Sequence, residues 1–320
     1  MRKRLFLLTL IAISLSTKVS AYDALIDGIA YNLDNSLRSA SVADYNSWYK
    51  GDIIVPPTVE WEGVTYSVYT VSEEAFMHCE SLTSVTLPNS VSTIGQRAFA
   101  HCPRLKTVNI PPSVTRIEAS TFSGCYSLES IVLPDGISYI GASAFRECSN
   151  LKSINLHDNI YNIGQYAFFG CSSLGSVNIP KNLSIIDYGT FSYCSSLTSI
   201  EIPSTVTILR DWAFADCSGL ESLTIPSSVN SINQNTFAGC GSLMSIVVEP
   251  GNTRYDSRNN CNAIIETSRN YLIRGCNTTI IPEGITLIDN SAFEGCNRLE
   301  SISIPNSVTS IENDAFRNCM

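Results

Sequence analysis

Residues 82–102 read L-T-S-V-T-L-P-N-S-V-S-T-I-G-Q-R-A-F-A-H-C, and this stretch decides the fold because the chain repeats its pattern of apolar residues. The final cysteine recurs every 23 residues, at Cys79, Cys102, Cys125, Cys148, Cys171, Cys194, Cys217 and Cys240, and the pattern returns at Cys296 and Cys319. Phenylalanine stands three residues before each of these cysteines, and leucine stands three residues after each except the last. A strict period of this length is typical of a solenoid, in which the repeats stack as successive coils.

Each repeat is expected to contain a short strand that ends at a proline. In pairs such as Val85 and Leu87, apolar residues alternate with polar ones, which indicates a strand with one buried face. Proline lacks the N–H that a continuing ladder requires, so the chain should leave the sheet there. The prolines are Pro88, Pro111, Pro134, Pro180, Pro203, Pro226, Pro282 and Pro305, and His157 replaces one of them. We therefore predict a repeat solenoid with a parallel strand ladder on its concave face.

The periodic pattern divides the chain into an array and an N-terminal region. Residues 76–320 hold the repeats, which must stack because a single coil buries too little surface to offset its backbone entropy. Leu243 and Leu299 are separated by two periods plus ten residues, and we expect a hairpin insertion near residues 253–274. Residues 22–75 are rich in Tyr, Trp and alternating apolar residues, which predicts a β-rich cap that grades into the array.

Residues 1–21 have the features of a secretory signal peptide. Arg2, Lys3 and Arg4 precede an apolar stretch, and Val19-Ser20-Ala21 forms a small-residue cleavage site, so we expect cleavage after Ala21. The protein is therefore predicted to be secreted or displayed at the cell surface.

The charge of the chain argues against several classes of partner. The predicted cleavage removes four of the 20 basic residues and leaves 16 against 29 acidic residues, a net charge of −13. A net negative charge disfavours nucleic acid and anionic lipid. No later apolar run approaches the roughly 20 residues that a membrane-spanning helix needs.

The chain ends at Cys319-Met320, half-way through a repeat. Solenoids normally cover their terminal interior face with a polar capping segment. We expect either a truncated or ragged end, or an open face that docks against a partner or another copy in end-to-end self-association.

The periodic cysteines have three interpretations. Stacked repeats place equivalent Cα atoms about 4.8 Å apart, which is within disulfide range. Equivalent side chains point in the same direction, however, which keeps their Cβ atoms near that distance and beyond the roughly 3.5–4.5 Å of a disulfide. A ladder of buried thiols is therefore favoured over disulfides. Metal binding is disfavoured because no C-x-x-C pair exists.

Two further cysteines lie outside the 23-residue register. Cys276 occupies a leucine position, which is consistent with burial. Cys261 lies in the insertion and is the best candidate for an accessible thiol, although burial is favoured for it as well.

The sequence gives little support for catalysis. The chain has three histidines and contains no G-x-S-x-G, H-E-x-x-H or phosphate-binding glycine motif. Carboxylates in the insertion, such as Asp256 and Glu266, are interpreted as solvated surface groups. We predict no enzyme activity, no cofactor and no metal site, with a glycan hydrolase as the weakest alternative.

The outward side of the predicted ladder is the candidate binding surface. It carries two columns of mainly uncharged polar side chains: Ser84, Thr86, Thr107, Asn109, Ser130, Ser153, Asn155, Ser176, Asn178, Ser199, Glu201, Ser222 and Thr224. Such residues often serve only solubility and cross-strand hydrogen bonding. If they bind a ligand, hydroxyl and amide groups repeated at strand spacing suit an extended glycan or peptide. Six aromatic residues that we expect to be exposed could stack against that ligand: Trp48, Trp61, Tyr126, Tyr161, Tyr193 and Trp212.

The pattern L-x-x-[VI]-x-[LI]-P-x-x-V-x-x-I-x-x-x-A-F-x-x-C resembles the BspA-like leucine-rich repeat of bacterial surface proteins, over about residues 53–320. The resemblance implies adhesion or ligand capture, with attachment to host matrix proteins, other cells or glycans. The alternative is a structural or periplasmic scaffold for protein–protein contacts without an external ligand.

Overall fold

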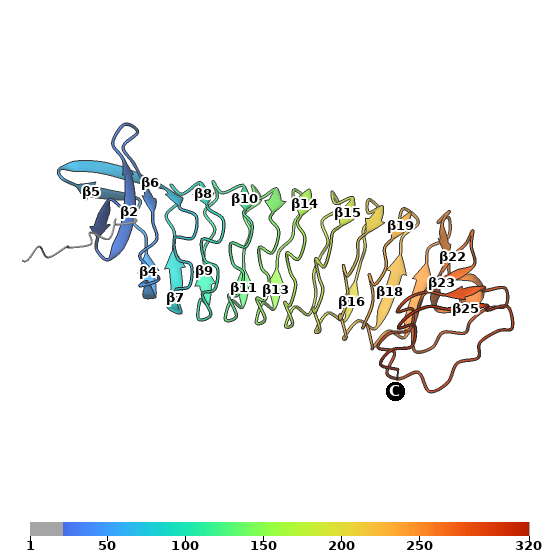
Figure 1. The fold of residues 1–320 in the computed structure, drawn as a ribbon. Helices are drawn as coiled ribbons and strands as arrows, with labels where there is room; N and C mark the ends of the chain where they lie inside the picture. The colour runs from blue at the N-terminus through green and yellow to red at the C-terminus, as the bar shows by residue number, and fades with distance from the viewer. Residues whose placement is uncertain (1–21, 320) are drawn as a thin grey trace, which may run out of the picture.

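The computed structural model describes residues 22–319, so the predicted leader lies outside the described residues. The repeats stack side by side in a row, with a group of strands at the N-terminal end and a change of direction near the C-terminal end (Figure 1). Nearly all regular structure is strand, and within residues 22–319 the single helical element is a 3₁₀ turn, η1 (Arg258–Asn260). No helix in this range has the length and apolarity needed to cross a bilayer.

A first ladder of parallel strands contains the residues that follow the leucine of each repeat. It consists of β7 (Ser81–Thr86), β9 (Thr107–Val108), β11 (Ser130–Ile131), β13 (Ser153–Ile154), β16 (Ser199–Ile200), β18 (Ser222–Ile225) and β20 (Ser245–Val248). Its strands pair at the 23-residue offset, with Ser130 opposite Ser153 and Ser199 opposite Ser222. The predicted repeat solenoid with a parallel strand ladder is confirmed.

A second ladder of very short strands lies along the opposite edge of the row (Figure 1). It consists of β8 (Thr93–Ile94), β10 (Arg116–Ile117), β12 (Tyr139–Ile140), β14 (Asn162–Ile163), β15 (Ile185–Ile186), β17 (Ile208–Leu209) and β19 (Ser231–Ile232). Its parallel pairs keep the same offset, as between Ile117 and Ile140. Two residues are too few to show alternation, so the sequence pattern did not predict these strands.

The proline that ends each strand of the first ladder supplies the carbonyl of a tight turn. The amide of Val91 donates to the carbonyl of Pro88 at 3.1 Å, and the amide of Val114 donates to that of Pro111 at 3.0 Å. His157 performs the same role, since its carbonyl accepts from the amide of Ile160 at 3.0 Å. The turn requires only this carbonyl, which explains why one repeat dispenses with proline.

The interior of the array is built from stacked phenylalanine rings and buried thiols. From Phe76 to Phe237, successive ring centroids lie 5.0–5.6 Å apart and the rings are nearly parallel. Each cysteine thiol from Cys102 to Cys240 donates to the carbonyl of the phenylalanine in the preceding repeat, as Cys125 does to Phe99 at 3.1 Å. The repeats are therefore coupled both by ring stacking and by thiol hydrogen bonds.

The turn between the two ladders contains two residues with left-handed backbone conformation in each repeat. One stands two residues before the phenylalanine, as Trp212 (φ 57°) does, and the other stands just before the cysteine, as Tyr193 (φ 60°) and Glu147 (φ 60°) do. Few non-glycine residues adopt this region. Hydrogen bonds to the next repeat hold the turn, as between the amide of Phe122 and the carbonyl of Ala144 at 2.8 Å.

Residues 24–71 form a sheet at the N-terminal end of the array. Its strands are β1 (Ala24–Ile26), β2 (Ile29–Asp34), β3 (Ser39–Val42), β6 (Val64–Val71) and β5 (Thr58–Trp61), in that spatial order. Strand β6 also pairs with β8, while β4 (Lys50–Ile54) pairs with β7. The N-terminal region is thus paired with both ladders of the array: its sheet joins the second ladder through β6, and β4, which is not part of that sheet, joins the first.

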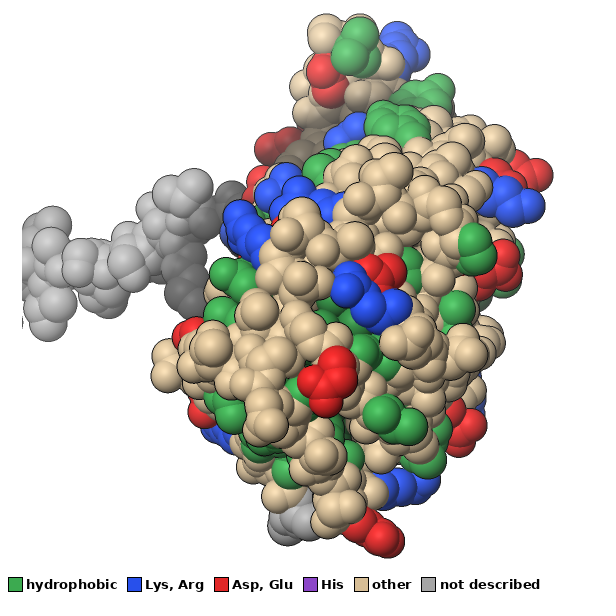
Figure 2. Space-filling model, turned by 90° about the vertical axis from the view of Figure 1, so that its right-hand side faces the viewer, with side chains coloured by type: hydrophobic (Ala, Val, Ile, Leu, Met, Phe, Trp, Pro, Cys, Tyr) green, Lys and Arg blue, Asp and Glu red, His purple; other side chains and the backbone are tan. Residues whose placement is uncertain are grey.

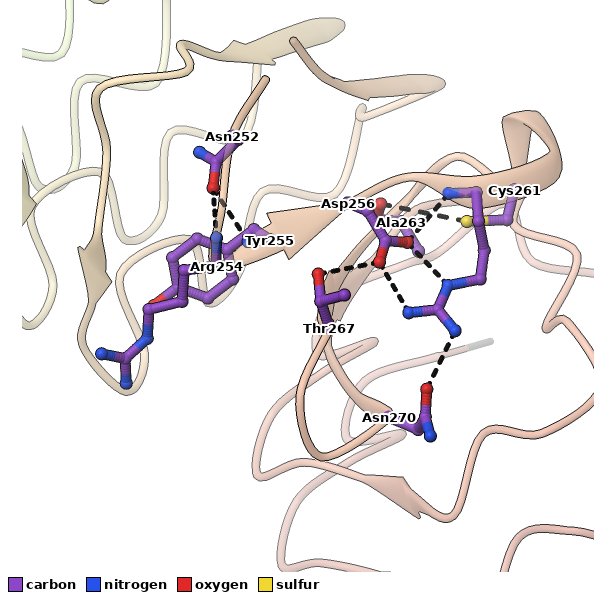
Figure 3. A network of polar contacts seen from close by, with 9 residues as sticks. Asn252, Arg254, Tyr255, Asp256, Cys261, Ala263, Thr267 and Asn270 are labelled. Carbon is purple, nitrogen blue, oxygen red and sulfur yellow. Dashed lines mark hydrogen bonds and ion pairs between the residues drawn. The ribbon is translucent and has the colours of Figure 1, made fainter. Parts of the chain in front are cut away.

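The insertion after β20 contains three antiparallel strands. Strand β21 (Tyr255–Asp256) pairs with β22 (Ala263–Glu266), which pairs with β23 (Tyr271–Gly275). Strand β23 then starts a parallel ladder with β24 (Leu287–Ile288) and β25 (Ser310–Ile311). Arg258 joins the segments by donating to the carboxylate of Asp256 and to the amide oxygen of Asn270, at 2.6 and 2.9 Å. Figure 3 labels these two partners. Burial opposes ionisation of Asp256, but the hydrogen bonds from Arg258 and Thr267, together with the charge of Arg258, lower its pKa.

A buried arginine connects the two sides of this insertion. Arg274 is only 3% exposed, and its guanidinium donates to the carbonyls of Ser291 at 3.0 Å, Glu294 at 3.1 Å and Cys240 at 3.5 Å. Around this point the buried apolar residues separate into a large cluster from the main array and a smaller one in the last repeats. Arg274 therefore joins the main array to its last repeats where the regular stacking is interrupted.

Candidate ligand-binding face and cysteine ladder

The predicted binding residues lie together along the first ladder. Of the thirteen, twelve are exposed and Ser84 is half-buried. Where the strands pair, the 23-residue offset places serine opposite serine, as Ser222 stands opposite Ser245. The repeat of Ser176 contributes no strand to the ladder, although its serine is exposed at the equivalent position. The structure thus assembles one extended polar surface, which we call the ladder face.

The ladder face is hollowed where β7, β9 and β11 meet. A depression of about 480 Å³ is lined by Thr86, Thr107, Asn109 and Ser130, with Val132 at its side. Val132 is 74% exposed, so an apolar contact is available beside the hydroxyl groups. This combination of polar and apolar groups suits the capture of a ligand in a shallow site.

Three of the predicted residues are already engaged by the protein itself. The side chain of Asn155 accepts from the amide of Leu133 at 2.8 Å and donates to its carbonyl at 3.0 Å, and Asn109 makes the same pair of bonds to Leu87. These two asparagines complete the backbone hydrogen bonding of the preceding repeat. The hydroxyl of Ser84 donates to Asp52 at 2.7 Å, which lowers the pKa of that carboxyl group. The hydroxyls from Ser130 onward are the groups best placed for a ligand.

Three of the six exposed aromatic residues, Tyr161, Tyr193 and Trp212, lie away from the ladder face, so the expected stacking against its ligand does not apply to them. For Trp48, Trp61 and Tyr126 it stays a prediction. Trp48 and Trp61 belong to the N-terminal region, and Tyr161 stands just before β14 of the second ladder. Tyr193 and Trp212 occupy the left-handed turn positions and line a different hollow. The period places an aromatic residue in a column but does not show which columns share a face.

The thiols of the cysteine ladder are expected to be unreactive at neutral pH. All ten periodic cysteines are free thiols, and nine of them are buried. Burial raises the pKa of Cys125, Cys194 and Cys240 from 9.0 to about 12. At neutral pH such thiols are protonated and therefore weak nucleophiles and weak metal ligands.

Cys261, the best sequence candidate for an accessible thiol, is 1% exposed, so that expectation is wrong and the favoured alternative of burial is confirmed. It packs with Ala263 and Ile265 in the smaller core cluster. Across residues 22–319, His, Cys, Asp and Glu side chains form no group of three that is placed to hold a metal ion.

The comparisons with known proteins agree on one repeat type. A family model described as "BspA type Leucine rich repeat region" matches in six copies over residues 63–174, 138–264 and 263–320. The comparison with curated proteins found no match.

Solved structures show the same architecture. A leucine-rich cell surface protein from Faecalibacterium prausnitzii is 29% identical, with a TM-score of 0.66 over 92% of this chain and 74% of that one. A leucine-rich repeat protein from Bacteroides ovatus is 25% identical, with a TM-score of 0.57 over 93% of each chain. The leucine-rich repeat protein of T. pallidum is 28% identical, with a TM-score of 0.52 over 68% of this chain and 88% of that one.

Proposed function

Because the chain belongs to the BspA-type leucine-rich repeat family, we propose that it is an exported binding protein that captures an extended ligand along its ladder face. Leucine-rich repeat proteins generally bind proteins, and one structural relative is described as a cell surface protein. Adhesion to a host matrix protein, a glycan or another cell is the role that we propose, with the protein secreted or displayed at the surface.

The observation that carries this proposal is the continuity of the uncharged hydroxyl groups. Ser153, Ser176 and Ser199 are exposed in three successive repeats, so their hydroxyl groups are open to a ligand. Beside this column, the charges of Lys152 and Glu129 neutralise each other at a separation of 2.8 Å. Many weak contacts at strand spacing suit a partner that is itself extended.

The test is binding of the protein to immobilised matrix proteins and glycans. A variant with Ser153, Ser176 and Ser199 changed to Arg places three charges on the ladder face. A matched control places three arginines at Ser113, Ser204 and Ser227, which are exposed outside that face. Equal melting temperatures of the three proteins establish that folding is preserved.

The expected result is saturable binding that is lost in the ladder-face variant and kept in the control. Binding that both variants keep would refute the ladder face as the site. Binding to no external ligand, together with binding to a protein of the same cell, would favour the structural or periplasmic scaffold. Release of reducing ends from a bound polysaccharide would instead indicate a glycan hydrolase, which we do not expect.

End-to-end self-association is a separate part of the proposal. Ile304 and Ile311 in the last repeats are 41% and 48% exposed, and Phe316 is half-buried. Figure 2 views the molecule from this end and shows hydrophobic side chains at the surface among polar and charged ones. We expect the sedimentation coefficient to rise with protein concentration and to lose this dependence in an Ile304→Lys, Ile311→Lys variant. A coefficient that is independent of concentration in the unmodified protein would refute self-association.

A further inference from the structure

A second hollow lies on the turn side of the array, away from the ladder face. It encloses about 530 Å³ and is formed by the turns that precede each cysteine, from the repeat of Tyr166 to that of Arg317. Its walls include four aromatic side chains: Tyr166, Phe169, Tyr193 and Trp212. Tyr193 and Trp212 are 50% and 46% exposed, so their rings are available to a ligand. We call this hollow the turn trough.

The size of one residue in each repeat explains the depth of the trough. Two residues before the cysteine, three successive repeats carry the small residues Ser192, Ala215 and Ala238, and all three line the trough. The same position carries Phe169 at one end, and Glu294 and then Arg317 at the other. The trough is therefore a row of small residues closed at one end by an aromatic ring and at the other by charged side chains.

The interrupted stacking at the insertion brings the charged end into place. A Cβ added at Gly295 would lie 3.0 Å from the Cα of Gly239, so the turns of these two repeats pack directly against each other. Arg274 fixes this approach by donating to the carbonyls of Cys240 and Glu294. Gly239 and Gly295, which are 56 positions apart in the sequence, thus become neighbours, and the repeat of Gly295 completes the charged end of the trough.

The charge of the trough is negative. Asp216, Glu294 and Asp314 face one cationic side chain, Arg317, whose Nε lies 3.8 Å from Oε1 of Glu294. Asp216 takes part in no ion pair within residues 22–319. Burial and, to a smaller extent, the neighbouring Glu294 raise its pKa, whereas hydrogen bonding with Tyr193 opposes the shift. A carboxylate in these surroundings gains free energy from a cation that enters beside it.

We propose that the turn trough binds a lysine or arginine side chain on an extended basic segment of a protein partner. Aromatic faces attract such cations most strongly when water is excluded, and carboxylates beside the rings add a direct charge contact. The protein uses the same contact internally, since the guanidinium carbon of Arg116 lies 3.8 Å from the ring centroid of Tyr139. The overall negative charge also steers a basic partner toward the protein. This site is separate from the ladder face and does not depend on the function proposed for it.

The test measures binding of the peptide Ac-Gly-Lys-Gly-Lys-Gly-NH₂ by titration calorimetry at low salt. The same peptide with norleucine in place of both lysines is the charge control. Asp216→Asn and Trp212→Ala are the trough variants, and asparagine at position 216 tolerates the left-handed φ of 56°. Asp135→Asn and Trp48→Ala are matched controls at exposed positions outside the trough.

We expect the lysine peptide to bind and the norleucine peptide to show no binding. Each trough variant should weaken binding about threefold to tenfold, as expected for loss of one cation–π or carboxylate contact, while both control variants bind as the unmodified protein does. Equal weakening by Asp135→Asn would show non-specific attraction and overturn the proposal, as would the absence of lysine-peptide binding. Binding of a neutral oligosaccharide that is lost in Trp212→Ala, without lysine-peptide binding, would assign the trough to a glycan instead.

Discussion

Raising the pH above 9 should unfold this protein because of its buried thiols. Six successive cysteines, from Cys125 to Cys240, are buried in the array. Burial raises the pKa of Cys125, Cys194 and Cys240 from 9.0 to about 12, and it raises the pKa of Cys148, Cys171 and Cys217 well above 9.0. Coulombic interaction with neighbouring cysteines adds to the shift at these last three.

A thiol with a raised pKa binds its proton more tightly in the folded protein than in the unfolded chain. The stability that it contributes is therefore complete below pH 9 and is lost as the pH rises toward the folded pKa. Between pH 8 and pH 10 each thiol should cost about 1.4 kcal/mol of stability. The six together should cost about 8 kcal/mol, which is comparable to the whole stability of many native proteins.

The assay is urea unfolding followed by far-ultraviolet circular dichroism, at several pH values from 7.5 to 10 and in the presence of a phosphine reductant. The urea midpoint should fall steeply above pH 9. A Cys148→Ala variant should lose about 1.4 kcal/mol less than the unmodified protein over the same range, because one thiol has been removed. A midpoint that stays constant between pH 8 and pH 10 would refute the buried-thiol argument.

Three further predictions concern the packing of the repeats. Phe145→Ala removes a fully buried ring stacked 5.4 Å from Phe122 and from Phe168, and should cost about 3–5 kcal/mol in urea unfolding. Phe316→Ala, with one stacked neighbour in the described chain, should cost less, and an equal cost would contradict the role of the stack. Arg274→Met leaves three carbonyls without their hydrogen-bond donor. Each carbonyl that no water reaches should lower the free energy of unfolding by about 1–3 kcal/mol, and amide exchange in residues 261–296 should become faster. Slow exchange there would show that water or a rearrangement replaces the guanidinium. Asn155→Ala removes two hydrogen bonds to Leu133 and should cost about 1–3 kcal/mol, whereas Asn178→Ala, whose side chain makes no such pair within residues 22–319, should cost less than 0.5 kcal/mol. Equal effects would refute a structural role for Asn155.

The regular part of the fold follows from the sequence because its determinants are local. Val85 and Leu87 alternate, Pro88 ends the strand, and Phe99 and Cys102 recur at a fixed period, so one repeat describes its neighbours. The second ladder does not follow, since a strand such as Arg116–Ile117 is too short to display alternation. Its pairing comes from the stacking of complete coils.

The surfaces are harder to predict than the core. Asn109 and Asn155 share a column with candidate ligand contacts, but their amides are used by the backbone of the preceding repeat. An arginine in an insertion is normally expected at the surface, and the burial of Arg274 depends on two repeats that approach each other across that insertion. The turn trough depends on the same approach of two repeats across the insertion, so no local sequence pattern predicts it.

The left-handed turn residues have a consequence for how such surfaces diversify. Because contacts to the next repeat hold the turn, positions equivalent to Tyr193 and Trp212 carry Gly, His, Glu, Asp, Arg, Ser or Asn in other repeats without a change of backbone. Single substitutions at these places exchange one displayed side chain and leave the stack beneath unaltered. The exposed turn residues of the array can therefore change independently of the core, so that new binding specificities can be selected one repeat at a time.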